Sequence, residues 1–240
     1  MKPKTIGMSV ALLTMIGFLF QGCENAPSGG EIKREVPQEK VDTQTIDKDQ
    51  SQTNDKPANV GAKISHGGPF KTFHVYTDGF AQGNHYIPSG WMGDYGDLKI
   101  DEKCVVTPHE GKNCFKVVYN GKAAQGARWA GIYWQNPPNN WGTRPGGYDL
   151  TGAKKATFWA RGEKGGERIE EFKIGGITGE YADSDVAGIG PVVLTTEWQQ
   201  FTIDLEGKDL SSISGGFCWA TNIDVNPEGT TFYLDDIKYE

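Results

Sequence analysis

The chain has 240 residues, of which 24 are Lys or Arg and 31 are Asp or Glu, giving a formal net charge of -7. This acidic balance argues against a nucleic-acid partner, because a protein that neutralises phosphates needs a basic surface. The 33 glycines and 12 prolines are too many for a helical protein, and the 7 Trp, 9 Tyr and 11 Phe are too many for a disordered one. Composition therefore predicts an all-β domain.

The first 22 residues have the features of an export signal. Lys2 and Lys4 give a positive start, and a short apolar run from Ile6 to Phe20 follows. The run ends in the letters LFQGC, which resemble the lipobox of bacterial lipoproteins, where a cysteine after a small residue receives lipid. We therefore expect a lipoprotein signal peptide at 1–22 and lipidation of Cys23. The protein would then be exported and held on a membrane by its lipid, at the periplasmic face or the cell surface. An ordinary signal peptide with an incidental cysteine is the alternative.

Residues 23–66 are predicted to form a disordered tether that begins with the lipidated cysteine. No aromatic residue occurs between Phe20 and Phe70, and Gln, Asp, Lys, Thr and Pro dominate the segment. Such a segment buries too little apolar surface to offset the entropy that ordering it would cost. No segment after residue 22 reaches the roughly 20 apolar residues of a membrane span.

Residues 67–240 are predicted to form one domain of short strands. Short apolar segments recur between Gly, Pro, Asn and Asp, and several of them alternate apolar with polar residues, as half-buried strands do. In 198–205 the apolar side of the alternation holds Phe201, Ile203 and Leu205. Many short strands with turns between them predict a sandwich or a jelly roll. The segments expected to be strands are 73–78, 97–101, 114–120, 128–135, 155–162, 169–176, 191–195, 198–205, 215–221 and 231–239.

Three cysteines remain besides Cys23. Cys104 and Cys114 flank a segment that is expected to connect two adjacent strands, and export permits disulfides. We therefore predict a Cys104–Cys114 disulfide, with two buried thiols as the alternative. Cys218 lies within an apolar strand and is expected to be a buried, unpaired thiol.

Three segments carry a family resemblance: DLTGAKKATFWARG (149–162), EWQQFTIDL (197–205) and FYLDDIKYE (232–240). They are similar to segments of galactose-binding-like β-sandwich domains, above all the carbohydrate-binding modules that accompany bacterial glycoside hydrolases. The resemblance covers about residues 70–240 and implies a jelly-roll β-sandwich that binds a polysaccharide or glycan. It also implies a structural calcium between the opening segment and the last strand, with Asp78 and Asp235 as ligands. Asp94 and Asp97 are further candidates for this site.

The aromatic residues give an independent reason to expect sugar binding. The C–H face of a pyranose ring stacks on a flat aromatic side chain, while amides and charged groups bond its hydroxyls. If the small and aliphatic face of 128–135 is the core, Trp129 and Tyr133 point away from it. Packing in the core or on a sheet is the alternative for every aromatic, and we expect it for Trp134, Trp159 and Trp198. The predicted sugar-binding residues are Trp129, Tyr133, Gln135, Asn140, Trp141 and Trp219.

No catalytic residue is predicted. Glycoside hydrolysis needs two carboxyl groups that flank the bond, whereas the glutamates of 162–171 alternate with basic residues as on a charged hairpin rim. Non-catalytic binding is therefore the main interpretation. The alternatives are a glycoside hydrolase or lyase-type enzyme on the same fold, and a structural or adhesive surface lipoprotein.

Overall fold

The computed structural model describes residues 69–240. The predicted signal peptide, Cys23 and the predicted tether lie outside this part of the chain. Within it, no helix is long and apolar enough to cross a membrane, and the one helical element is the 3-10 turn η1 (Tyr95–Asp97). The strands are β1 (Phe73–Tyr76), β2 (Ile87–Gly93), β3 (Leu98–Cys104), β4 (Cys114–Tyr119), β5 (Trp129–Gln135), β6 (Lys155–Gly162), β7 (Arg168–Ile169), β8 (Glu171–Gly175), β9 (Val186–Ile189), β10 (Val192–Val193), β11 (Gln199–Asp204), β12 (Gly215–Asn222) and β13 (Thr230–Tyr239).

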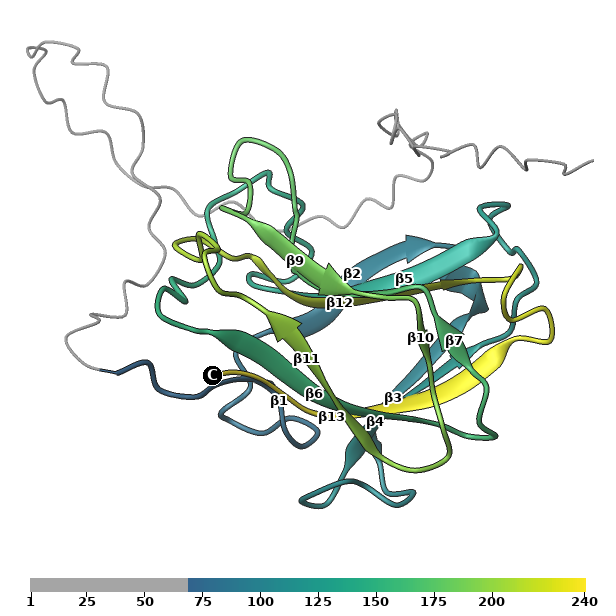
Figure 1. Ribbon diagram of the computed structural model, residues 1–240. Coiled ribbons are helices and arrows are strands. Elements are labelled where there is room, and N and C mark those ends of the chain that lie inside the picture. The colour runs from purple at the N-terminus through teal and green to yellow at the C-terminus, as the bar shows by residue number, and fades with distance from the viewer. Residues whose placement is uncertain (1–68) are drawn as a thin grey trace, which may run out of the picture. The chain divides into compact units, whose positions relative to one another are not determined.

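The strands form two facing antiparallel sheets, as the sequence predicts (Figure 1). Sheet 1 has the order β11-β6-β13-β4-β3, and β1 pairs with β13 beside β4. Sheet 2 has the order β2-β5-β12-β8-β9, and β7 and β10 form a short separate ladder. The all-β sandwich is thus confirmed.

The last strand, β13, is the centre of sheet 1. It pairs with β6 along one side, while the other side pairs first with β4 and then with β1. The register shifts after Asp235, and Asp236 has a φ of 46°, so the strand carries a bulge at this pair of acids. The bulge lies where β13 passes from one partner strand to the other.

Most strand predictions are confirmed, and two strands were not predicted. The expected apolar side of β11 faces inward, with Ile203 fully buried. β2 was not expected because Pro88, Gly90 and Gly93 in its sequence are typical of a loop, yet it pairs with β5 as an edge strand with a bulge. β9 is the other unpredicted strand, at the opposite edge of sheet 2.

Aromatic rings fill the space between the sheets. Phe158 of sheet 1 lies 4.6 Å from Phe172 and 5.0 Å from Phe217 of sheet 2, between ring centroids. Trp134 and Phe115 are 4.7 Å apart and bridge the sheets in the same way. All five rings are fully buried, so they account for a large share of the hydrophobic stabilisation.

The outer face of sheet 1 is covered in part by the loop 105–113. The imidazole of His109 stacks on the indole of Trp159 at 3.8 Å, and Trp198 donates its indole N–H to the carbonyl of Thr107 at 2.9 Å. Arg161 lies over the ring of Tyr233 at 3.8 Å beneath the same loop. Trp159 and Trp198 therefore pack on the sheet, as expected.

The predicted disulfide is not present. Cys104 and Cys114 are register partners on β3 and β4, but both are buried free thiols, and the thiol of Cys114 donates to the carbonyl of Cys104 at 3.5 Å. Burial raises the pKa of Cys114 to about 12, which disfavours the thiolate that disulfide formation requires. Cys218 is a buried free thiol, as predicted.

Candidate functional site

The side chains of β5 that do not point into the core lie on the outer face of sheet 2. Ala130, Ile132 and Trp134 are fully buried between the sheets, so the predicted assignment of alternate side chains of this strand to the core is correct. Trp129 and Tyr133 therefore lie on the outer face. Four residues of strand separate them, which corresponds to about 13 Å.

Trp219 is a core residue, contrary to the prediction. It pairs in register with Ile132, points inward and is fully buried, with its indole edge-on to Phe232 at 5.0 Å. A side chain without exposed surface offers no face to a sugar. Trp219 is therefore excluded from the candidate site.

Tyr133 packs within the outer face of sheet 2. Its ring has too little exposed surface to stack on a sugar. It is 4% exposed, donates its hydroxyl to the carbonyl of Gly175 at 3.0 Å, and packs with Ile177, Cys218 and Met92. Burial raises the pKa of this phenol well above its usual value. Its ring instead meets the edge of the Trp141 indole at 5.9 Å and 89°.

Trp141 is the most open aromatic of this face, with 40% of its surface exposed. It lies on the loop between β5 and β6, which is held from below by buried amides. Gln135 accepts from the hydroxyl of Ser89 and donates to the carbonyl of Asn140, both at 3.0 Å. Asn140 donates to the carbonyl of Arg144 at 2.9 Å. Gln135 and Asn140 are fully buried, so they position the loop and do not reach a sugar, contrary to the prediction.

A second loop, between β8 and β9, braces the Trp141 loop. The N–H of Tyr181 donates to the carbonyl of Gly142 at 2.9 Å. The carboxylate of Asp183 accepts from the N–H groups of Ile177 and Ser214, at 2.9 and 2.5 Å, and burial raises its pKa above the usual value. Figure 1 shows the two loops rising at the same end of sheet 2.

At the other end of β5, a buried carboxylate fixes the approach to Trp129. Asp94 is fully buried and accepts from the N–H groups of Gln125, Ala127 and Arg128 at 2.8, 2.9 and 2.5 Å. Its own N–H donates to the carbonyl of Trp129 at 2.7 Å. Asp94 thus shapes the turn before β5 and places Trp129, which is partly exposed, beside its register partner on β12.

Charged groups lie beside the two indoles. The ammonium of Lys173 is 5.6 Å from the Tyr133 ring centre and 2.8 Å from the carboxylate of Glu171. Next to Trp129, Arg128 pairs with Asp224, and both are well exposed. The face therefore combines two accessible indoles with donors and acceptors.

The two predicted calcium ligands, Asp78 and Asp235, accept hydrogen bonds from backbone N–H groups. Asp235 accepts from the N–H groups of His109 and Asp236 at 2.9 and 3.0 Å, one on each carboxylate oxygen. One oxygen of Asp78 accepts from the N–H groups of Lys112 and Asn113 at 2.8 and 2.7 Å. Within residues 69–240, neither Asp78 nor Asp235 belongs to a group of three converging metal-ligating side chains. Asp235 holds the middle of the loop 105–113, and Asp78 holds its C-terminal end.

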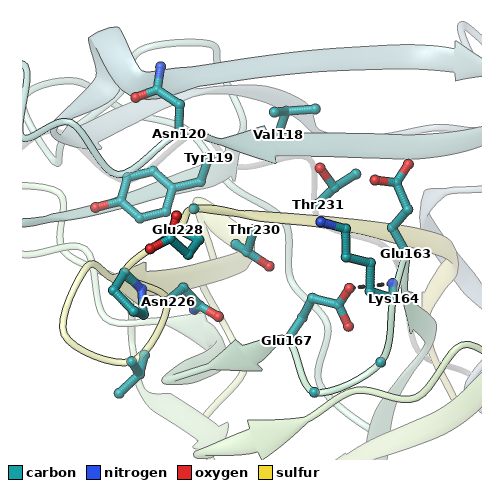
Figure 2. A pocket seen from close by; sticks show the side chains of 15 residues that line it. Val118, Tyr119, Asn120, Glu163, Lys164, Glu167, Asn226, Glu228, Thr230 and Thr231 are labelled. Carbon is teal, nitrogen blue, oxygen red and sulfur yellow. Dashed lines mark hydrogen bonds between the residues drawn. The ribbon is translucent and has the colours of Figure 1, made fainter.

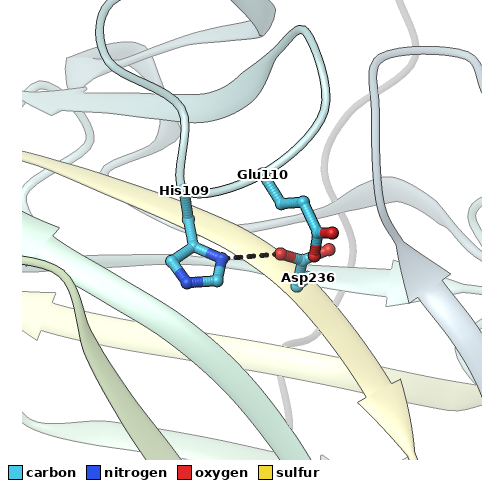
Figure 3. A group of neighbouring side chains, drawn as sticks. All are labelled: His109, Glu110 and Asp236. Carbon is cyan, nitrogen blue, oxygen red and sulfur yellow. Dashed lines mark hydrogen bonds and ion pairs between the residues drawn. The ribbon is translucent and has the colours of Figure 1, made fainter.

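The acids and imidazole that do converge nearby are His109, Glu110 and Asp236 (Figure 3). Their ligand atoms lie within 4.8 Å of one another, and the Nδ1 of His109 is 2.8 Å from the carboxylate of Asp236. Calcium prefers an all-oxygen set, which this group does not provide. The hydrogen bond between His109 and Asp236 fastens the loop to the bulge of β13.

Chelation tests the calcium prediction directly. Because Asp78 and Asp235 belong to no group of three converging ligands in the part of the chain that the structure describes, we expect the melting temperature to be the same with and without a chelator. A melting temperature that falls with chelator and recovers with added calcium would show that a bound ion stabilises the folded state.

The buried Asp235 gives the protein a pH-dependent stability. Burial and then the neighbouring Asp236 raise its pKa from 3.8 to about 7. The folded state thus keeps a proton that the unfolded state releases, and the free energy of unfolding falls as pH rises through this window. We expect a loss of about 2 kcal/mol between pH 5 and pH 7. Urea unfolding across this range measures it, and Asp235→Asn should reduce the slope; equal slopes in both proteins would contradict the assignment.

Comparison with known proteins gives similar structures but no sequence family. No family model and no curated protein matches the chain. A family 30 carbohydrate-binding module is 17% identical over 71% of this chain and 98% of its own, with a TM-score of 0.48. The family 11 module from Clostridium thermocellum, in complex with a β-1,3-1,4-mixed-linked tetrasaccharide, is 16% identical over 68% and 93%, with a TM-score of 0.44. The CBM22-1 xylan-binding domain from Paenibacillus barcinonensis is 12% identical over 71% and 92%, with a TM-score of 0.40.

Proposed function

We propose that the sandwich binds a polysaccharide or glycan along the outer face of sheet 2 without cleaving it. The observation that carries the proposal is the pair of accessible indoles, Trp129 and Trp141, on one face of the same sheet. Tyr133, whose ring is edge-on to the Trp141 indole, lies about 13 Å along β5 from Trp129. The strand distance from Trp129 to the residue beside Trp141 exceeds one sugar ring, so the two indoles would stack on different rings of one chain.

The polar groups beside the indoles suit the hydroxyls of such a chain. Lys173 donates, Glu171 accepts, and the amide of Asn222, which is in register with Trp129, donates, since its oxygen accepts the N–H of Val225 at 3.1 Å. Tyr133 and the buried amides beneath Trp141 hold the face in shape before the ligand arrives, which reduces the entropy lost on binding. Binding would therefore rest on stacking, with polar contacts setting orientation.

The carboxylates around this face favour binding over hydrolysis. Cleavage needs one carboxyl group as acid and a second as base or nucleophile, on opposite sides of the bond. Glu171 is paired with Lys173, and Asp224 is paired with Arg128. Asp183 is occupied by backbone N–H groups.

A glycan array probed with the full chain tests this function, followed by a hydrolysis assay on each glycan that binds. Binding without release of shorter sugars is the expected result. Release of shorter sugars would favour the glycoside hydrolase or lyase alternative. Binding to no glycan would favour a structural or adhesive role.

We also propose that Cys23 carries the lipid that holds the protein on a membrane. The proposal rests on the sequence around Gly22 and Cys23. Replacing Cys23 with serine removes the thiol that a lipid would be attached to, so the protein should move from the membrane fraction to the soluble fraction. Fractionation followed by immunoblotting measures this, and a Cys23→Ser protein that stays with the membrane would show that another feature anchors it.

A further inference from the structure

His109, Glu110 and Asp236 form a mixed group of one imidazole and two carboxylates on the outer face of sheet 1 (Figure 3). His109 and Glu110 belong to the loop 105–113, and Asp236 belongs to the bulge of β13. One ligand atom of each side chain lies within 4.8 Å of the other two, and within residues 69–240 no other three side chains of this kind converge so closely. The group lies on the opposite side of the sandwich from the face proposed for the glycan.

The backbone on both sides of this group is held by one buried carboxylate. Asp235 is fully buried; its Oδ2 accepts the N–H of His109 at 2.9 Å, and its Oδ1 accepts the N–H of Asp236 at 3.0 Å. The ring of His109 is fixed in turn by stacking on the indole of Trp159 at 3.8 Å and 17°. Two of the three side chains, 127 residues apart in the chain, are thus brought together and held by the fold itself.

The side chains of the group are open to solvent and lack a basic partner. His109 and Asp236 expose 25% and 18% of their side chains, and Glu110 is exposed. In the part of the chain that the structure describes, neither Glu110 nor Asp236 pairs with a lysine or arginine, and the single ion pair of the group joins Asp236 to His109. A cation can therefore reach the group from solvent, and it meets two carboxylates there.

The other acid-rich part of the sandwich does not converge in this way. A pocket of about 410 Å³ between the β6–β7 turn and the β12–β13 loop is lined by three glutamates, Glu163, Glu167 and Glu228 (Figure 2). Glu163 bonds Lys116, and Glu167, which is 8% exposed, accepts the N–H of Lys164 at 2.6 Å. The sequence prediction of a solvated charged rim is therefore wrong for Glu167. Among residues 69–240, these acids form no group of three converging ligands.

We propose that His109, Glu110 and Asp236 bind a zinc ion or another late first-row transition ion. An imidazole nitrogen with two carboxylate oxygens is a donor set that suits such ions, whereas calcium and magnesium take oxygen ligands. The ion takes the place of the proton between Nδ1 of His109 and the carboxylate of Asp236, and that proton passes to the solvent. Water completes a tetrahedral set, so the site is open and exchanges its ion with the solution.

Small side-chain movements separate the present arrangement from zinc coordination. Zinc lies about 2.0–2.2 Å from nitrogen and oxygen ligands, so two ligands of a tetrahedral ion are about 3.3–3.5 Å apart. Nδ1 of His109 and the oxygen of Asp236, now 2.8 Å apart, would separate slightly. The exposed Glu110 would close the rest of the distance by rotation about its own bonds. A bound ion would then join the loop 105–113 to β13 through three side chains.

Calorimetric titration of the untagged full chain with zinc chloride tests the site, since a histidine tag would itself bind zinc. One zinc ion should bind at least about tenfold more tightly than calcium or magnesium. Zinc at a hundred times its Kd should raise the melting temperature by about 5–10 °C, and calcium at the same concentration should not raise it. Equal affinity for zinc and calcium, or no zinc binding at submillimolar concentration, overturns the proposal.

Variants place the ion on these side chains and separate binding from folding. Glu110→Gln should weaken zinc about tenfold or more while leaving the melting temperature of the zinc-free protein unchanged, because this exposed carboxylate bonds no other side chain. His109→Gln should weaken zinc at least as much. Glu197→Gln is the matched control, because Glu197 is an exposed glutamate next to Trp198, whose indole bonds the same loop. Unchanged zinc affinity in Glu110→Gln or His109→Gln, or an equal loss in Glu197→Gln, overturns the assignment.

Discussion

Replacing Trp129 with alanine is expected to weaken glycan binding and to lower the free energy of unfolding by about 1–3 kcal/mol, less than the loss of a core tryptophan. The indole is only partly exposed on the outer face of sheet 2, so folding buries most of its surface but leaves part of it open. Stacking on a sugar ring depends on the same flat surface. Titration with the glycan that binds best and urea unfolding measure the two effects separately.

The control for this experiment is Trp134→Ala, five residues along the same strand. Trp134 is fully buried against Phe115 and Phe217, so its loss should cost about 3–5 kcal/mol, as for other large-to-small core substitutions. Trp141→Ala should behave like Trp129→Ala. A strongly destabilised Trp129 variant with a stable Trp134 variant would reverse the assignment of the two faces.

Replacing Asp94 with alanine is expected to lower the free energy of unfolding by about 3–5 kcal/mol, because three backbone N–H groups lose a charged acceptor. The same change should weaken glycan binding, since the turn that Asp94 holds leads directly into Trp129. Urea unfolding and glycan titration of the same variant measure both losses.

Asp101→Ala provides the comparison for Asp94. Its exposed carboxylate accepts one N–H, from Lys103 at 3.0 Å, so water replaces the lost acceptor and the cost should stay below about 1 kcal/mol. If both variants lose the same stability, the burial of Asp94 is not the source of its effect. If Asp94→Ala is destabilised yet binds glycan normally, Trp129 does not depend on this turn.

The sequence was sufficient to predict the architecture because alternation within a strand is a local property. The parity of β5 and the apolar side of β11 could be read directly from residues two apart. The edge strand β2 escaped prediction because its Pro and Gly residues are typical of loops, while its strand state depends on pairing with β5, a partner about forty residues away in the chain.

The candidate site was predicted less well because burial by loops is not a local property. Trp129 and Trp141 lie where the sequence indicates, but Gln135 and Asn140 are covered by the loop they support. Trp219 alternates with Phe217 in a strand whose two sides are both buried, so alternation alone could not exclude it. Glu167 is 8% exposed although the charge pattern predicts a charged rim, because Gly162 leaves room for its carboxylate and the charge pattern does not reveal this.

The pairing of β1 with β13 places the first and the last strand of the sandwich side by side. Phe73 and Tyr239 are opposite each other in register, and Figure 1 shows the C-terminus beside β1. A short peptide from Glu240 to Phe70 would therefore close the sandwich into a ring without disturbing either sheet. New ends placed in the exposed turn 206–208 would then give a circular permutant with the same strand neighbours. The sandwich is also suited to insertion into a surface loop of another protein, because the chain enters it and leaves it on neighbouring strands.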